Sequence, residues 1–206
     1  MATRQRDESR LRSLLTQECA RIMVDEGIKD FLAAKRKAAA RLRITNKALL
    51  PGNAEIEQAL LEYQRLFKST TQPIQLRALR ETAWEAMQFL ACFHPRLVGP
   101  VLTGTAYSHA NVNLHVFADT SEDVLLFLLE QNIPAEAGER RLRFGNGEYA
   151  YLPVLSFSAG EATVELTIFK RDVEREAPRS PIDGKPMRRA GLDELHALLE
   201  QERLED

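Results

Sequence analysis

The chain has 206 residues, 44% of them hydrophobic and 28% charged, with a formal net charge of −2. This length suits one compact domain with an appendage, or two small domains, and is ample for burying a core. The composition is ordinary for a soluble globular protein, and the longest apolar run, residues 124–129, falls far short of the roughly 20 residues that a membrane span needs.

The first half of the chain is predicted to be helical. Gly27 is a plausible stop for the first helix, Asn53 is the expected N-cap of the third, and Pro95 follows the end of the fourth. Apolar residues at helical spacing, or a run of strong helix formers, place these helices near residues 11–22, 28–42, 53–67 and 76–90.

Beyond Pro95 the pattern changes to short strands and turns. The expected strands lie at 96–99, 111–118, 140–144, 149–157 and 162–169, and the expected helices at 120–132 and 192–204. Pro153 lies within its strand and indicates an edge position or a bulge. We therefore expect an α/β (α+β) protein with a small mixed sheet. Its predicted parts are a helical region at 1–72, the sheet domain at 73–175, and a polar loop with a C-terminal helix at 176–206.

Positive charge is concentrated near the N-terminus. Residues 1–47 hold 12 Lys and Arg against 6 Asp and Glu, so the rest of the chain is acidic. A basic helix of this kind can lie along nucleic-acid phosphates, and the candidate residues are Lys35, Arg36, Lys37, Arg41 and Arg43. Phe31 is the only aromatic residue in this segment, which therefore lacks interleaved rings for base stacking. The alternative is that the segment contacts the acidic part of this or another copy of the chain.

One stretch, residues 98–119, carries the functional hypothesis. Gly99-Pro100 and Gly104 surround a turn, and Asn111-Val112-Asn113 opens the strand that follows. A later strand contains Glu165. This order resembles the nucleotidyltransferase superfamily in its minimal, polymerase-β-like members, over roughly residues 73–172. Their signature is Gly-Ser, a second glycine, an Asp-hydrophobic-Asp strand and a third carboxylate.

The resemblance implies a nucleotide-binding turn at Gly99, Pro100, Gly104 and Thr105, and catalytic positions at Asn111, Asn113 and Glu165. In the family the turn holds phosphates and the carboxylates hold two Mg²⁺ ions. Here Pro100 replaces the serine and lacks an N–H donor, and both aspartates are asparagines. Because Mg²⁺ prefers carboxylate and phosphate oxygens, we expect a site disabled for two-metal transfer.

Two further residues are expected in the same cleft, His115 and Ser108. His115 shares a strand face with Asn111 and Asn113, so it is a candidate for a polar pair with Glu165, as an acid–base pair or the ligand of a single softer metal. The simpler interpretation is a hydrogen-bonded histidine without a catalytic role.

The leading hypothesis is a catalytically inactive or altered nucleotidyltransferase-like protein that binds a nucleotide, a nucleic acid or a protein partner. One alternative is an active metal-dependent enzyme that uses Glu165 with Asn111 and Asn113. The other is nucleic-acid binding through the basic helix. No cofactor is expected, except Mg²⁺ under the first alternative. The N-terminus lacks a secretory signal and the two cysteines form no CxxC motif, so we expect a cytoplasmic protein without membrane contact. The sequence identifies neither the ligand nor the oligomeric state.

Overall fold

The computed structural model describes residues 2–67, 71–106 and 110–205. The chain forms two compact units, one comprising Met1–Pro73 with Pro181–Asp183 and the other Ile74–Ser180 with Gly184–Asp206. The first unit is helical and the second contains a mixed sheet with helices, so the expected α/β fold class is confirmed. No helix in the described ranges is both long and apolar enough to cross a bilayer.

Three helices make up the helical unit, with a 3₁₀ turn at Lys47–Leu49. They are α1 (Ala2–Asp25), α2 (Phe31–Arg41) and α3 (Asn53–Phe67). Helix α2 begins after Asp30, whose side chain accepts the N–H of Ala33 at 2.6 Å. Apolar side chains from all three helices form one core, including Leu15, Ile22, Ala34, Ala38, Ile56 and Leu60.

The start of α3 differs from the prediction. Asn53 is the first residue of the helix and does not cap it. Instead the carboxylate of Glu55 accepts the N–H of Gly52 at 2.6 Å, which is the glutamate half of a capping box. The amide oxygen of Asn53 accepts a hydrogen bond from Lys35 Nζ at 2.6 Å, so a contact with α2 competes with the capping role.

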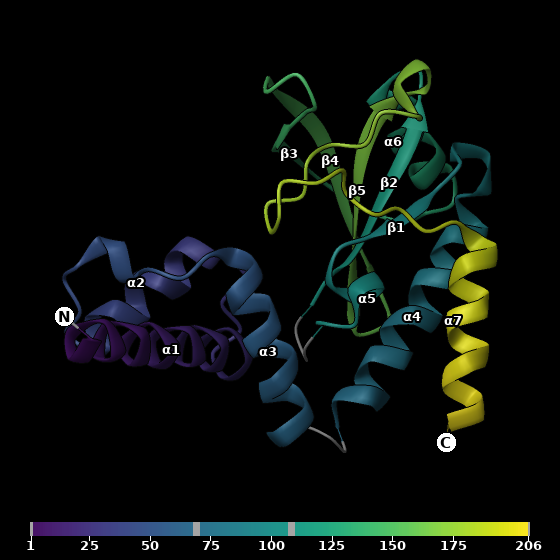
Figure 1. The fold of residues 1–206 in the computed structure, drawn as a ribbon. Coiled ribbons are helices and arrows are strands. Elements are labelled where there is room, and N and C mark those ends of the chain that lie inside the picture. The colour runs from purple at the N-terminus through teal and green to yellow at the C-terminus, as the bar shows by residue number, and fades with distance from the viewer. Residues whose placement is uncertain (1, 68–70, 107–109, 206) are drawn as a thin grey trace. The chain divides into compact units, whose positions relative to one another are not determined.

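The second unit is built on a five-stranded sheet with the order β1-β2-β5-β4-β3. Strands β2 and β5 are parallel and the other neighbours are antiparallel (Figure 1). Its elements are α4 (Gln72–Phe89), β1 (Arg96–Val98), α5 (Pro100–Thr103), β2 (Val112–Ala118), α6 (Ser121–Glu130), β3 (Glu136–Arg143), β4 (Tyr149–Ala159), β5 (Ala162–Lys170) and α7 (Leu192–Glu205), with 3₁₀ turns at Ala91–Phe93 and Arg171–Val173.

The two faces of this sheet differ in character because strand side chains alternate. One face carries apolar residues such as Leu114 and Leu166, which share a core with Met87 of α4, Leu128 of α6 and Leu195 of α7. The opposite face carries the polar positions of β2, β5 and the neighbouring strands. We call it the polar face.

Strands β3 and β4 extend beyond the rest of the sheet. Strand β4 pairs with β3 from Tyr149 to Ser156, but with β5 only from Val154 to Ala159. Tyr149 to Pro153 and the facing part of β3 therefore form a two-stranded ribbon. Pro153 lies where the pairing with β5 begins, in a part of the strand that has one neighbour, as expected for an edge proline.

Candidate functional site

The glycine turn after β1 uses backbone N–H groups for hydrogen bonds within the turn. Gly99 has φ 74° and Gly104 has φ 83°, and between them lies the single helical turn α5. The N–H groups of Leu102 and Thr103 both donate to the carbonyl oxygen of Gly99, at 3.0 and 3.1 Å. Pro100 has no N–H to offer. The turn therefore retains few backbone donors for a phosphate.

A buried arginine of α4 fixes the turn from the core side. Arg80 is 7% exposed, and its guanidinium donates to the carbonyl oxygens of Val101 at 3.1 Å and Leu102 at 3.4 Å. It also forms an ion pair with Glu202 of α7. Thr105, a predicted nucleotide contact, is only 6% exposed, and its hydroxyl lies 3.0 Å from that of Thr103. This part of the turn is built into the fold rather than open to a ligand.

The predicted catalytic residues come together on the polar face. The register of β2 and β5 places Asn113 directly beside Glu165. Asn111 Nδ2 donates to one oxygen of Glu165, and Asn113 Nδ2 donates to the carbonyl oxygen of Asn111 at 3.0 Å. Gly99 lies against Asn113, since a Cβ on this glycine would be 3.7 Å from Asn113 Nδ2.

Arg140 of β3 completes this cluster, and sequence reasoning missed it. Its Nη2 donates to the second oxygen of Glu165 in an ion pair. Its Nη1 lies 3.3 Å from Asn113 Oδ1 and 3.4 Å from Thr167 Oγ1. The guanidinium therefore contacts the oxygen atoms that a metal ion would use. We refer to Asn111, Asn113, Glu165, Thr167 and Arg140 as the Asn–Glu–Arg cluster.

The cluster does not fit two divalent cations. Both oxygens of Glu165 are occupied by donors, and the two asparagines supply neutral amides where Mg²⁺ prefers carboxylates. Asn111 presents an N–H₂ group to Glu165, a contact that an aspartate would turn into repulsion between two carboxylates. Across the described ranges, no three His, Cys, Asp or Glu side chains are grouped closely enough to hold a metal ion.

His115 lies on the polar face but not in an open cleft. It is 2% exposed, and its ring packs 4.5 Å from that of Phe169. The register places Thr167 beside it, and its Nδ1 accepts a hydrogen bond from Arg189 Nε at 3.0 Å. The imagined pair with Glu165 is therefore not formed. Ser108, the other predicted cleft residue, lies outside the described residues.

Burial and two cations determine the protonation state of His115. Burial, with Arg189 and then Arg140 adding repulsion, lowers the pKa of His115 to about 3. The ring is neutral at physiological pH, which matches its role as an acceptor from Arg189. Arg189 lies over the rings of Phe117 and Phe169, and its Nη1 donates to the carbonyl oxygen of Glu174 at 2.8 Å. Burial also lowers the pKa of Arg189.

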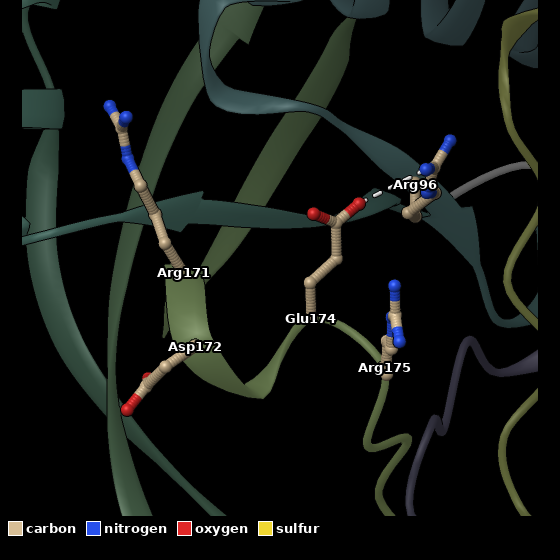
Figure 2. Close-up of a pocket in the computed structure, with 5 residues that line it drawn as sticks. All are labelled: Arg96, Arg171, Asp172, Glu174 and Arg175. Carbon is tan, nitrogen blue, oxygen red and sulfur yellow. Dashed lines mark hydrogen bonds and ion pairs between the residues drawn. The ribbon is translucent and has the colours of Figure 1, made fainter.

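A pocket of about 450 Å³ lies apart from the Asn–Glu–Arg cluster, where the chain leaves β5. It is lined by Arg96, Arg171, Asp172, Glu174 and Arg175. Figure 2 shows Glu174 between the arginines, and its carboxylate accepts a hydrogen bond from Arg96 at 3.1 Å. The pocket thus combines both signs of charge, and none of the predicted site residues lines it.

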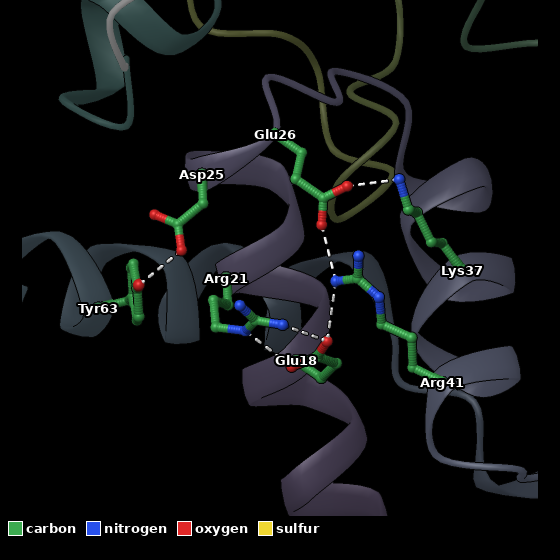
Figure 3. A network of polar contacts seen from close by, with 7 residues as sticks. All are labelled: Glu18, Arg21, Asp25, Glu26, Lys37, Arg41 and Tyr63. Atoms are coloured by element: carbon green, nitrogen blue, oxygen red, sulfur yellow. Dashed lines mark hydrogen bonds and ion pairs between the residues drawn. The ribbon is translucent and has the colours of Figure 1, made fainter.

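Two cations of the basic helix α2 pair with acids of α1. Lys37 pairs with Glu26, and Arg41 pairs with Glu26 at 2.7 Å and with Glu18 at 3.2 Å (Figure 3). Lys35 is bonded to Asn53, as described above. Of the predicted nucleic-acid contacts, Arg36, Lys37, Arg41 and Arg43 are exposed. Arg43 has a left-handed φ of 55° just after the helix.

Comparisons with known proteins add little to this geometry. No protein-family model matches the chain, and no curated protein matches it in sequence. The solved structure of a cytoplasmic RNA terminal U-transferase is similar to 54% of this chain, at 13% identity and a TM-score of 0.29. The chain spans only 29% of that protein. The function must therefore be inferred from the residues of the site itself.

Proposed function

We propose that the sheet unit is a nucleotidyltransferase-like module without two-metal catalysis, which acts by binding a nucleotide, a nucleic acid or a protein partner. The turn Gly99–Gly104, the strand carrying Asn111 and Asn113, and Glu165 on the adjacent strand have the order and register that the resemblance requires. One observation carries the loss of catalysis, namely the guanidinium of Arg140 among the groups that would otherwise hold metal ions.

The chemistry of transfer explains why this matters. Two-metal transfer depends on divalent cations that stabilise the attacking and leaving oxygens. In the Asn–Glu–Arg cluster the guanidinium of Arg140 neutralises the single carboxylate, Glu165. Unlike a metal ion, a guanidinium donates hydrogen bonds and cannot coordinate a phosphate oxygen and a hydroxyl at the same time. The side chains of this cluster satisfy one another and are suited to hold the strands together rather than to activate a nucleophile.

Restoring the missing acids tests the proposal. The variant Asn111→Asp/Asn113→Asp/Arg140→Gln should gain a rise in melting temperature with Mn²⁺ and a nucleoside triphosphate, because it regains carboxylates and loses the competing cation. Wild type should show no Mn²⁺-dependent rise, so any stabilisation by the nucleotide should be the same with and without the metal. The matched control Asn111→Asp/Asn113→Asp/Arg143→Ala removes an arginine from the other face of β3 and keeps Arg140, so it should respond weakly. Melting without metal establishes that each variant is folded.

The active-enzyme alternative makes the opposite prediction for the natural protein. It requires metal-dependent transfer of labelled nucleotide by wild type, and its loss in Glu165→Ala. We expect no transfer by either protein. Transfer by wild type that disappears in Glu165→Ala would overturn the proposal.

A further inference from the structure

The β3–β4 ribbon presents an unusual combination of exposed side chains. Tyr149 is 54% exposed and Tyr151 is 67% exposed, although both lie in a regular strand. The register places Arg143 opposite Tyr149 and Arg141 opposite Tyr151, so all four side chains project from one face. We call these four residues the Arg–Tyr face.

This face is open because the ribbon extends past its neighbours. Along β4 the same side of the sheet is buried at Leu155 and Phe157, where helices cover it. Strand β5 does not reach Tyr149 or Tyr151. The tyrosine rings therefore remain in solvent where the pattern of the strand would otherwise direct them into a core.

The cations of the Arg–Tyr face have no acidic partner among the residues that the structure describes. Arg141 packs instead on the ring of Tyr149, with its Cζ 3.9 Å from the ring centroid. Arg143 is exposed, and its carbonyl oxygen accepts the N–H of Arg179 at 2.6 Å. The side chain of Arg179 lies beside Gly145 in the ribbon turn, which adds a third guanidinium to this end of the ribbon.

Such a surface matches the chemistry of single-stranded nucleic acid. Bases stack on exposed aromatic rings regardless of sequence, and arginines bind phosphates and also stack on bases. Residues two apart on one strand face are about 6.6 Å apart, so the two arginines form a short row of charges beside the rings. A duplex keeps its bases stacked on one another, and an acidic peptide offers charge without flat rings for stacking.

We propose that the Arg–Tyr face binds single-stranded nucleic acid, with bases stacked on Tyr149 and Tyr151 and phosphates bound by Arg141 and Arg143. This inference rests on the proposed binding function and names the partner class for it. It does not use the Asn–Glu–Arg cluster, so the two proposals fail in different measurements. A response of wild type to Mn²⁺ would end the first, and an absence of strand binding would end the second.

The test measures binding of the full chain to labelled mixed-sequence RNA and DNA strands of about twelve nucleotides, within the usual range of single-strand site sizes. Tyr149→Ala/Tyr151→Ala should weaken binding at least about fivefold, the effect of losing one stacked base. Tyr149→Phe/Tyr151→Phe should bind like wild type because it keeps the rings. The RNA and DNA arms show whether the 2′-hydroxyl contributes.

The salt dependence of binding and competition experiments distinguish stacking on this surface from nonspecific charge attraction. Removing a phosphate contact with Arg143→Ala should reduce the slope of log affinity against log salt by about 0.7. The control Lys35→Ala/Arg36→Ala/Lys37→Ala removes three charges from α2. In this background, Tyr149→Ala/Tyr151→Ala should weaken binding by the same factor as in wild type. Several results would overturn the proposal: no strand binding by wild type, no loss on removing the tyrosines, equal or tighter binding of a duplex, or equally effective competition by oligoglutamate.

Discussion

The two faces of the β3–β4 ribbon use arginine in opposite ways. Arg140 and Arg141 are consecutive, so they project to opposite sides of the sheet. Arg140 is bound by Glu165 and Asn113 on the polar face, whereas Arg141 packs on Tyr149 and remains exposed. The difference shows that a cation's partner, rather than its presence, determines whether a surface is closed or available to a ligand.

Helix α2 extends the comparison to the helical unit. It lies in the most basic part of the sequence, yet Glu18 and Glu26 of α1 pair with two of its cations. The ribbon is less basic in total because Glu139 lies in it and Glu148 lies in the turn that joins its strands. Its arginines 141 and 143 nevertheless have no acidic partner among the described residues, so it is the better candidate for binding an anionic chain.

Disrupting the Asn–Glu–Arg cluster should have the largest effect on stability. Glu165→Ala removes the anion from Arg140 and the acceptor from Asn111. Loss of one partner in a buried ion pair costs about 3–5 kcal/mol, and this pair is partly exposed, so we expect a loss of about 2–3 kcal/mol. Chemical denaturation followed by the fluorescence of Trp84 measures it. A matched Arg143→Ala variant should lose well under 1 kcal/mol.

The pairing of Arg189 with a neutral ring predicts a dependence of stability on pH. The pKa of His115 falls from 6.5 to about 3 on folding, so the unfolded chain binds more protons between these values. The free energy of unfolding therefore decreases as pH falls through this window, and His115 should contribute a loss of about 2 kcal/mol between pH 6.5 and 5.

His115→Asn isolates this contribution because an amide oxygen can accept from Arg189 but does not titrate. The variant should be less stable at neutral pH, since it loses the packing against Phe169. Its stability should change less than that of wild type between pH 6.5 and 5. Equal pH dependence in the two proteins would show that His115 is not the responsible group.

The smallest expected effect on stability comes from releasing the cations of α2. Glu18→Gln/Glu26→Gln removes the acids that pair with Lys37 and Arg41, and surface ion pairs contribute little to folding. Melting temperature should fall only slightly. If these ion pairs are what prevents Lys37 and Arg41 from binding nucleic acid, the variant should gain a salt-sensitive affinity for RNA. Replacing both cations, as Lys37→Ala/Arg41→Ala, should remove it. No gain would show that α2 is unsuited to nucleic acid even when its charges are free.

Local patterns were sufficient to predict the order of elements and part of the site. Strand alternation placed Asn111 and Asn113 on one strand face, and the resemblance implied that Glu165 lies near them. The structure has Asn113 beside Glu165 in register. The same alternation contained an unused signal for His115. Phe117 shares its strand face, and a large apolar residue at that position indicates that this part of the face is covered.

Arg140 and Arg189 escaped prediction for a different reason. The run of arginines at 140–143 shows that alternate residues face opposite sides, but the choice of side depends on the register with β4. Arg189 reaches His115 from a loop 74 residues later in the chain. Contacts of this kind depend on tertiary structure, and neither composition nor periodicity contains them. Net charge likewise revealed the excess in residues 1–47 but not its pairing with Glu18 and Glu26.

Arg80 makes the glycine turn dependent on a distant helix. One guanidinium holds the carbonyl oxygens of Val101 and Leu102 and also binds Glu202 of α7. A molecule that displaces α7 would pull Glu202 away from this guanidinium and weaken its hold on the two carbonyl groups. The conformation of the turn and the position of α7 therefore depend on the same guanidinium.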